Sequence, residues 1–263
     1  MIDLSTDSIK DFQTCERLYD YRYVEKLPET IYSRDLYALK FENSLKNIIN
    51  FFWFKKQAGI TPSYASLLNR WEKIWFPKDT THYDLTIEQH ESAYGNMSSL
   101  TAQAANILLN FHETYSQLDA IPLSIADEYV VTVDKTVRIH DKFDLIYRHA
   151  GQNYVVKFIF NYKNSYRQMY QVDFSSMYLA FKNLHPGKIA STKFGYVDLM
   201  SNNLKFNEYE ITEQDIESIN YWCATIEDKD VFVPRRGLTY YCKKCPFDTP
   251  CSKWSFSTQT KVK

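Results

Sequence analysis

Apolar residues recur every three or four positions through the first half of the chain, which is the spacing of one face of an α-helix. The pattern predicts a helix from the N-cap Ser5 to about Val24 and a second from about Leu36 to Lys56. A third carries Leu67, Trp71 and Trp75 on one stripe, and a fourth runs from about Glu91 to Leu118. Residues 1–120 are therefore expected to be mainly helical, and their tryptophans are interpreted as core residues.

The pattern changes after Pro122, where β-rich runs alternate with short turns. Strands are expected at 128–133, 136–148 and 154–162, forming an antiparallel meander, followed by a helix at 170–184. Further strands are expected at 188–200 and up to Ile211, and a helix from the cap Thr212 to about Ile226. These elements predict one mixed α/β domain over residues 1–263, with the core sheet and its helices in 121–227 and a tail in 228–263.

Composition and charge narrow the class of protein. The 263 residues are 44% hydrophobic and carry a formal net charge of −1, so the average surface is not that of a strongly basic nucleic-acid binder, although a local basic groove is compatible with it. No apolar run approaches the length that spans a membrane, and the first residues lack the pattern of a secretion signal. We therefore expect a cytoplasmic protein without membrane contact, whose thiols stay reduced.

Four cysteines suggest a metal centre that joins the two ends of the chain. Cys242, Cys245 and Cys251 form a C-x2-C-x5-C run, and Cys15 lies on the face of the first predicted helix. On spacing alone, a structural zinc ion and an iron-sulfur cluster fit about equally well, and disulfides fit less well. The fifth cysteine, Cys223, lies in an apolar stretch and is interpreted as buried packing.

A second candidate site lies in the meander. Asp144 precedes one predicted strand, and Asn161 and Lys163 are two residues apart at the end of the next, so the three can meet at one sheet edge. A carboxylate, an amide oxygen and a lysine are groups that metal-assisted phosphodiester hydrolysis uses, with Asp144 and Asn161 binding Mg2+ or Mn2+. Polar residues at strand ends are also common on solvated rims, so the triplet is weak by itself.

Together, the residues of the two candidate sites resemble the motifs of the RecB-like branch of the PD-(D/E)XK nuclease superfamily. The resemblance is to its iron-sulfur members in particular, which include AddB-type and CRISPR spacer-acquisition nucleases. The opening Leu4-Ser5-Thr6-Asp7-Ser8-Ile9-Lys10-Asp11-Phe12 followed by Cys15-Glu16-Arg17-Leu18-Tyr19 is similar to the family's start, and the cysteine run is similar to its finish. The resemblance implies a restriction-endonuclease-like central sheet flanked by helices. It also implies a 4Fe-4S cluster held by Cys15, Cys242, Cys245 and Cys251 as a clasp, and it favours this cluster over zinc.

The resemblance carries over only partly to the catalytic centre. Asp144 matches the second motif, and the run 161–165 matches the third with Lys163 at the lysine and Asn161 in place of the acid. A second alignment would put Lys157 at the acid and Ile159 at the lysine, leaving nothing catalytic; the first is preferred because an apolar run should precede the motif. Glu128 resembles a supporting acid. The motif I histidine is missing, with Ser44 or Lys46 at its position, and Phe174 replaces the glutamine that precedes Tyr178 in the family's Q-x3-Y motif.

Two functions follow from these observations. The chain is either a divalent-metal-dependent deoxyribonuclease with weakened chemistry, using Asp144, Asn161, Lys163 and Glu128, or a catalytically inactive module that binds DNA or a partner protein. In both cases single-stranded or end-containing DNA is the expected ligand, and a helicase or another DNA-processing protein is a partner by analogy. The candidate phosphate contacts are Lys142, Arg148, Lys163, Arg167, Arg235, Arg236, Lys243 and Lys244.

Overall fold

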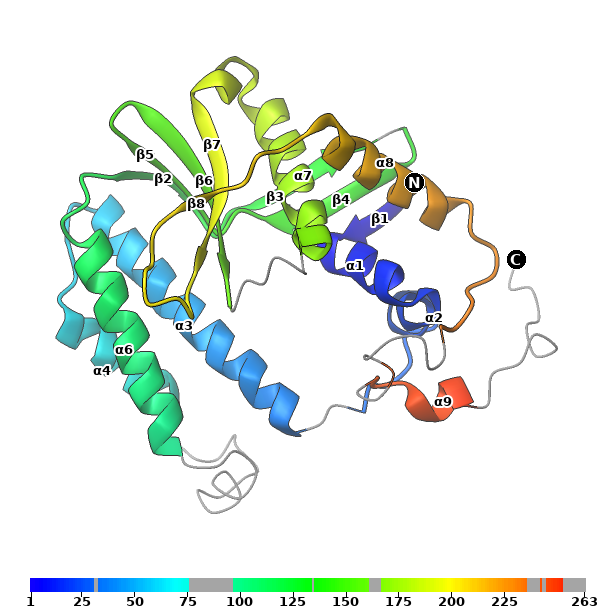
Figure 1. The fold of residues 1–263 in the computed structure, drawn as a ribbon, viewed down its shortest axis with the longest axis horizontal. Coiled ribbons are helices and arrows are strands. Elements are labelled where there is room, and N and C mark those ends of the chain that lie inside the picture. The colour runs from blue at the N-terminus through cyan, green and yellow to red at the C-terminus, as the bar shows by residue number, and fades with distance from the viewer. Residues whose placement is uncertain are drawn as a thin grey trace.

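Two mixed β-sheets form the centre of the protein, as the computed structural model in Figure 1 shows. It describes residues 1–30, 33–75, 97–133, 135–160, 167–235, 242 and 245–252. The larger sheet has the order β2 (Ile121–Ile125), β5 (Leu145–His149), β6 (Gln152–Ile159), β7 (Thr192–Asp198) and β8 (Asn207–Glu208). β5 and β6 are antiparallel because a tight turn joins them, whereas β6 and β7 are parallel because helix α7 (Arg167–Leu184) connects them.

The smaller sheet ties the N-terminus to the middle of the chain. β1 (Ile2–Ser5) pairs in parallel with β4 (Val137–Lys142), which pairs on its other side with β3 (Glu128–Thr132). Phe143 and Asp144 separate β4 from β5, so the single strand expected at 136–148 is divided between the two sheets. This division places Asp144 where the two sheets meet.

Helices cover the sheets and bury two apolar clusters. α3 (Ser33–Gln57), α4 (Tyr64–Trp75) and α6 (Met97–Tyr115) pack against the larger sheet, with Trp53 and Trp71 fully buried among them. α1 (Thr6–Thr14), α7 and α8 (Glu213–Glu227) enclose the second cluster together with β3 and β4. The mixed α/β class is confirmed, and so is the core position expected for the tryptophans.

The first predicted helix is interrupted rather than continuous. α1 begins with a capping box between Ser5 and Ser8 and ends at Cys15, whose backbone is extended at φ −164° and ψ 119°. A short helix α2 (Glu16–Tyr19) and a π-helical turn (Asp20–Val24) follow. Because Cys15 stands at the break, its side chain is not fixed by the phase of either helix.

Other expected boundaries also differ. The strand expected from residue 188 begins with a 3-10 helix (Pro186–Ser191), and the strand expected up to Ile211 is only the two-residue β8. The fourth predicted helix is described only over α6. None of the helices in the described ranges is long and apolar enough to cross a membrane.

The C-terminal tail returns to the N-terminal helices (Figure 1). Phe247, just before α9 (Asp248–Ser252), is fully buried, and its ring lies 5.5 Å from the ring of Tyr21. The amide of Thr30 donates to the carbonyl of Pro246 at 3.1 Å. The tail and the segment after α1 are therefore packed against each other, although more than 200 residues separate them in sequence.

Candidate functional site

Asp144 lies at the junction of the two sheets, and its carboxylate is fixed from two sides. Its Oδ2 accepts the backbone N–H of Phe158 at 2.8 Å and lies 3.4 Å from Nζ of Lys46 on α3. The Asp144 side chain is only 8% exposed, and that of Lys46 is 28% exposed. Lys46, one of the two residues that the resemblance puts in place of a histidine, thus contacts Asp144.

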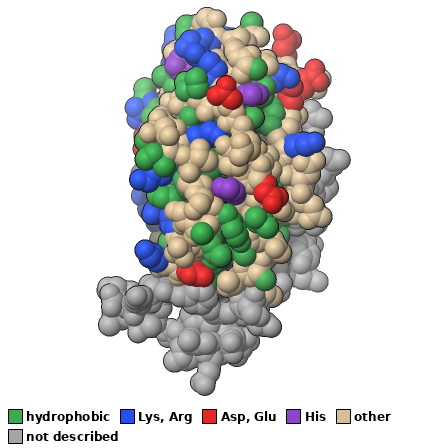
Figure 2. Space-filling view, turned by 90° about the vertical axis from the view of Figure 1, so that its left-hand side faces the viewer, with side chains coloured by type: hydrophobic (Ala, Val, Ile, Leu, Met, Phe, Trp, Pro, Cys, Tyr) green, Lys and Arg blue, Asp and Glu red, His purple; other side chains and the backbone are tan. Residues whose placement is uncertain are grey.

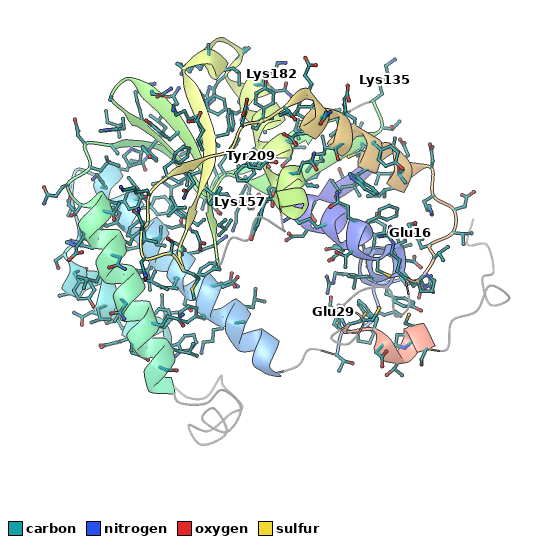
Figure 3. All side chains as sticks on the ribbon, in the orientation of Figure 1. Glu16, Glu29, Lys135, Lys157, Lys182 and Tyr209 are labelled. Carbon is teal, nitrogen blue, oxygen red and sulfur yellow. The ribbon has the colours of Figure 1, made fainter. Side chains whose placement is uncertain are left out.

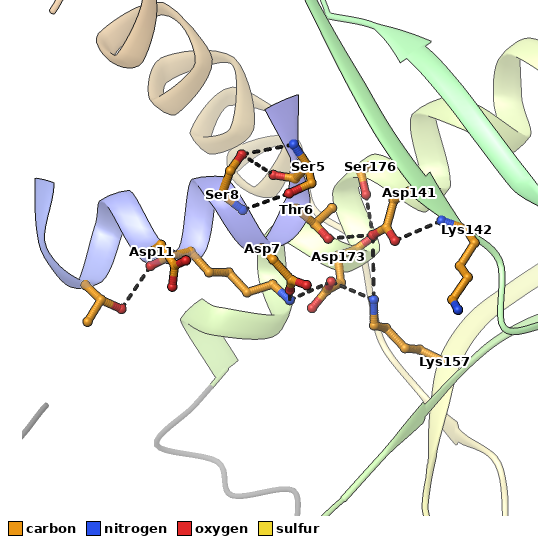
Figure 4. A network of polar contacts seen from close by, with 12 residues as sticks. Ser5, Thr6, Asp7, Ser8, Asp11, Asp141, Lys142, Lys157, Asp173 and Ser176 are labelled. Atoms are coloured by element: carbon orange, nitrogen blue, oxygen red, sulfur yellow. Dashed lines mark hydrogen bonds and ion pairs between the residues drawn. The ribbon is translucent and has the colours of Figure 1, made fainter. Parts of the chain in front are cut away.

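Lys157 is the residue of β6 that faces Asp144. Leu145 pairs with Val156 in the antiparallel register, and extending that register by one residue brings Asp144 opposite Lys157. The Lys157 ammonium lies 2.6 Å from Oδ1 of Asp173 on α7 and 3.8 Å from Oδ2 of Asp141 on β4. Figure 4 shows these contacts, and Figure 3 shows Lys157 in the interior, close to where α7 approaches the sheets.

Asp173 has a second cation beside it. Nζ of Lys10, from α1, lies 2.9 Å from the same Oδ1 atom, and the Asp173 side chain has no exposed surface. On the other side of the centre, Oδ2 of Asp141 accepts the hydroxyl of Thr6 at 2.5 Å. The centre therefore draws on α1, α3, β4, β6 and α7, which bring together residues from position 6 to position 173.

Ion pairs link the side chains of this centre. Three carboxylates (Asp141, Asp144 and Asp173) face three ammonium groups (Lys10, Lys46 and Lys157), and the exposed carboxylate of Asp7 also lies 3.0 Å from the ammonium of Lys10. Burial alone would lower the pKa of Lys157, but the negative charges of Asp173, Asp141 and Asp144 outweigh it and raise that pKa well above its ordinary value. Burial would likewise raise the pKa of Asp173, yet Lys10 and Lys157 hold it at about 2. In both residues the neighbouring opposite charges outweigh burial, so the net effect favours the charged form.

Of the four predicted catalytic residues, the structure describes Asp144 and Glu128. Asp144 lies in the centre, whereas Asn161 and Lys163 lie outside the described residues. Glu128 is exposed at the start of β3, in register with Lys142. Its neighbour Tyr129 is buried and is bonded to Ser176 of α7, so the alternation of the strand directs Glu128 to the opposite face.

Among the predicted phosphate contacts that the structure describes, Lys142, Arg148 and Arg235 lie on different segments of the chain. Lys142 is exposed next to Asp141, and Figure 4 shows its ammonium directed away from that carboxylate. Arg148 lies at the far end of β5, where its guanidinium donates to Oδ1 of Asn153. On the face seen in Figure 2, lysine and arginine side chains are interspersed with acidic and apolar ones. The Arg167 side chain and residues Arg236, Lys243 and Lys244 lie outside the described part.

Sequence reasoning missed the roles of Asp173 and Lys10 and gave Lys157 only in the second of two alignments. The signal for Lys157 was a lysine inside an otherwise apolar strand, which requires a partner when it is buried. No comparable local signal marks Asp173 or Lys10, because each lies on an amphipathic helix where a charged residue is ordinary. The register of β5 and β6, extended by one residue, brings Lys157 opposite Asp144, whereas Asn161 and Lys163 of the first alignment lie outside the described residues.

The four predicted cluster ligands lie close to one another. The backbone of Arg235 contacts two of them: its N–H donates to Sγ of Cys15 at 3.5 Å, and its carbonyl accepts from Sγ of Cys242 at 3.4 Å. Cys245 and Cys251 follow within the same tail, where the Cys245 amide donates to the Cys242 carbonyl at 3.4 Å. None of the five cysteines forms a disulfide, and Cys223 is buried, as expected.

The electrostatic effects on Cys245 also indicate that the four thiols lie near one another. Burial raises the pKa of the Cys245 thiol, and the neighbouring thiols of Cys251, Cys15 and Cys242 raise it further, against the opposing effect of a backbone bond from Phe247. In the described parts of the chain, no three His, Cys, Asp or Glu side chains are arranged closely enough to hold a metal ion. The four sulfurs therefore share one neighbourhood but would have to move closer together to bind a common centre.

Comparisons with known proteins add little to this geometry. No protein-family model matches the chain, and no curated protein matches it. Among solved structures, the one described as the crystal structure of SSO0001 aligns with 96% of this chain and 87% of its own, at 13% identity and a TM-score of 0.40. That alignment is too loose to support an argument, so the site has to be interpreted from its own residues.

Proposed function

We propose that this protein is a nuclease-like iron-sulfur protein that binds DNA without cutting it. The observation that carries this proposal is the contact of Lys157, which the second alignment puts at the acid position, with the carboxylates of Asp141 and Asp173. The mixed sheet with helices on both sides is compatible with the PD-(D/E)XK-like fold that the sequence resembles.

Loss of cutting follows from the charge of the centre. A hard divalent cation needs oxygen ligands with a net negative charge, because it gives up its water reluctantly. Here the ammonium groups of Lys10, Lys46 and Lys157 already lie beside the three carboxylates and offset their negative charge, with Lys10 shared between Asp173 and Asp7. In the alignment that gives Lys157 the position of the acid, Ile159 takes the position of the catalytic lysine, so the groups that activate water are also replaced.

The cysteines support a structural role for the cluster. Cys15, Cys242, Cys245 and Cys251 supply the four thiolates that a 4Fe-4S cluster takes. The backbone of Arg235 contacts both Cys15 and Cys242, so these two proposed ligands share one neighbour. A bound cluster would link the tail covalently to α1 and α2, and it would replace the mutual repulsion of thiolates with metal-sulfur bonds.

DNA binding is supported by cations at the rim of the centre. Lys142 is exposed beside Asp141, and Lys46 is partly exposed at the other edge. Phosphate contacts from such lysines give affinity without sequence preference, as expected for a protein that acts on single strands or ends. Lys142 is the candidate to test first because its ammonium is directed away from the internal carboxylates (Figure 4).

The test uses anaerobically purified protein with labelled single-stranded and double-stranded DNA, in Mg2+ or Mn2+. We expect iron and a broad visible absorbance band, binding without cutting, and no effect of Asp144→Ala on the DNA products. Lys142→Ala should weaken binding and lower the dependence of log K on log salt by about 1. Lys135→Ala is the matched control, since Lys135 is an exposed lysine on the β3–β4 hairpin, far from Lys157 in Figure 3.

Metal-dependent cutting that Asp144→Ala abolishes would overturn the proposed loss of catalysis and favour the deoxyribonuclease. Colourless protein that contains stoichiometric zinc would overturn the cluster. Equal losses of DNA affinity in Lys142→Ala and Lys135→Ala would show that the rim of the centre is not the DNA-binding site.

A further inference from the structure

The part of the chain that forms α3 and α4 is positively charged, although the whole chain is not. Residues 38–75 contain six lysines and arginines and two glutamates, Glu42 and Glu72, so their net charge is 6 − 2 = +4. The whole chain has a net charge of −1, which leaves −1 − 4 = −5 for all other residues. A negatively charged partner is therefore attracted to this side of the protein.

Three of the six cations already have partners within the protein. Nζ of Lys46 lies 3.4 Å from Asp144, and Nζ of Lys40 lies 4.8 Å from the centre of the Trp75 ring. The ammonium of Lys56 donates to three backbone carbonyls at the end of α6. These three lysines are not counted as contacts for a partner.

The other three cations are exposed. They are Lys55 on α3 and Arg70 and Lys73 on α4, and none of them forms an ion pair with a carboxylate in the described parts of the chain. Glu72 stands two residues from Arg70, about 200° around the axis of α4, so it projects from another side of the helix. The positive charge of these three side chains is therefore not offset by a carboxylate at the same spot.

Aromatic rings lie among these cations, where α4 packs beside α3 (Figure 1). The guanidinium carbon of Arg70 lies 4.5 Å from the centre of the Phe51 ring, and Nζ of Lys55 lies 5.8 Å from that centre. Nη2 of Arg70 donates to Oδ1 of Asn47 at 3.4 Å. Asn47, Phe51 and Phe54 are spaced i, i+4 and i+7, so they share one face of α3. Phe54 is the outermost ring, and 51% of it is exposed.

An exposed ring flanked by cations suits a partner that is flat, apolar on its faces and negatively charged along its backbone. Unpaired bases stack on aromatic side chains while lysine and arginine contact the phosphates, so single-stranded nucleic acid has these properties. A membrane surface would instead favour a broad apolar helix face. Here Phe54 shares its face with the amides of Asn47 and Asn50.

We infer that Phe54, Lys55, Arg70 and Lys73 form a contact site for single-stranded nucleic acid, with a base stacked on the Phe54 ring and phosphates on the three cations. The inference rests on the DNA binding proposed above and deepens it, because it adds a site on α3 and α4 to the rim at Lys142. DNA and RNA share the chemistry that this site recognises, so the experiment compares the two.

The experiment measures fluorescence anisotropy of labelled oligothymidylate and oligouridylate of about 16 nucleotides at several salt concentrations. Phe54→Ala and Phe54→Leu should each weaken binding by about fivefold or more, whereas Phe54→Tyr, which keeps the ring, should change it by less than about twofold. Lys55→Ala and Arg70→Ala should each lower the slope of log K against log salt by about 0.7. The wild-type protein should bind the single strand in preference to the duplex.

Two matched controls test whether the position of these side chains matters. Lys182→Ala removes an exposed lysine of α7 that lies 5.9 Å from the ring of Tyr178, much as Lys55 lies near Phe51, and it is well away from α4 (Figures 1 and 3). Tyr221→Ala removes a ring of α8 that is 61% exposed. Both controls should bind like the wild type. Thermal melts should show that every variant is folded, since all the substituted side chains are exposed.

Three results would overturn the inference. One is wild-type affinity in Phe54→Ala. Another is full affinity in Phe54→Leu together with loss in Phe54→Ala, which would indicate an apolar contact instead of stacking. The third is binding to vesicles of phosphatidylserine and phosphatidylcholine, weakened by the same variants, without binding to either oligonucleotide. Tighter binding of oligouridylate, weakened by the same variants, would support the site and make RNA its ligand.

Failure of this site and failure of the rim give different results. Loss of affinity in Lys142→Ala but not in Phe54→Ala would remove the site on α3 and α4 and leave the proposed DNA binding in place. The reverse pattern would support the site on α3 and α4 and remove the rim. The iron content and the absence of cutting are measured separately and do not depend on either substitution.

Discussion

Single charged side chains are buried in this centre, which is unusual in a protein interior. Asp173 has no exposed surface and depends on Lys10 and Lys157 for its charged state. Removing one partner from a buried ion pair is expensive, because the remaining charge keeps its desolvation penalty. The same groups give the protein a specific dependence on pH.

We predict that Asp173→Asn lowers the free energy of unfolding at pH 7 by about 3–5 kcal/mol, because it leaves two ammonium groups without their shared carboxylate. Asp173 has a pKa lowered to about 2, below its ordinary 3.8, so its stabilising contribution is present above pH 4 and is lost as the pH falls towards 2. Urea unfolding at several pH values should therefore show the two proteins converging between pH 4 and pH 2. A difference that persists unchanged at pH 2 would contradict this account.

These residues show how much of the candidate site could be predicted from the sequence. The apolar run of β6 made a strand predictable, and Asp144 was predicted as a site residue from its place in the meander; it lies between β4 and β5 and accepts the Phe158 amide. The partner of Asp144 was not predictable from spacing, because two alignments differing by four residues both placed a polar group near it. Lys157 comes opposite Asp144 through strand pairing, and Asp173 contacts Lys157 through the packing of α7; no local pattern in the sequence records either contact.

At the scale of elements, helix and strand types were predicted well and their limits less well. The apolar periodicity of residues 5–24 is continuous, so nothing in it indicates the extended backbone at Cys15 that separates α1 from α2. The alternation of residues 136–148 is likewise continuous, yet β4 and β5 belong to different sheets. Both breaks arise from tertiary contacts, which override local preference.

Gly195 gives an element-scale prediction for the edge of the larger sheet. A Cβ atom there would lie 2.1 Å from the carbonyl oxygen of Asn207 and 2.6 Å from the ring of Phe206, so β8 can approach β7 only beside a glycine. Gly195→Ala should lower the free energy of unfolding by about 1–3 kcal/mol. Gly187→Ala, which meets no atom within 4 Å, should change it by less than about 0.5 kcal/mol in the same urea titration. Equal effects of the two substitutions would show that close packing is not the reason for a glycine at position 195.

The whole molecule is closed by contacts between its two ends. The tail packs Phe247 against Tyr21, with the Arg22 guanidinium 6.0 Å from the centre of the phenylalanine ring, and β1 pairs with β4 in the middle of the chain. The sequence predicted that Cys15 and the C-terminal cysteines would meet, and the Arg235 contacts are in keeping with this. The apolar part of the closure was not predicted, since a single phenylalanine in a polar tail carries no periodic signal.

We predict that Phe247→Ala loosens the tail without unfolding the sheets. Losing a fully buried ring costs about 3–5 kcal/mol, enough to accelerate amide exchange at Thr30 by roughly 100-fold, since that amide donates to Pro246. Amides of β6 should keep their protection. Thr249→Ala, a change at an exposed position of the same tail, should leave amide exchange at Thr30 and in β6 unchanged. Slow exchange at Thr30 in Phe247→Ala would show that the Phe247 ring does not hold the tail.

Pairing of the chain ends also dictates when the protein can finish folding during its synthesis. Ile2–Ser5 can take their place as a strand only after Val137–Lys142 have left the ribosome, and the surroundings of Cys15 are complete only after Cys251 has emerged, 251 − 15 = 236 residues later. At roughly 5–20 residues per second, that interval lasts about 12–47 s. Throughout it the first helices stay exposed to chaperones and to loss by aggregation, so the nascent chain is the form of this protein most dependent on cellular protection.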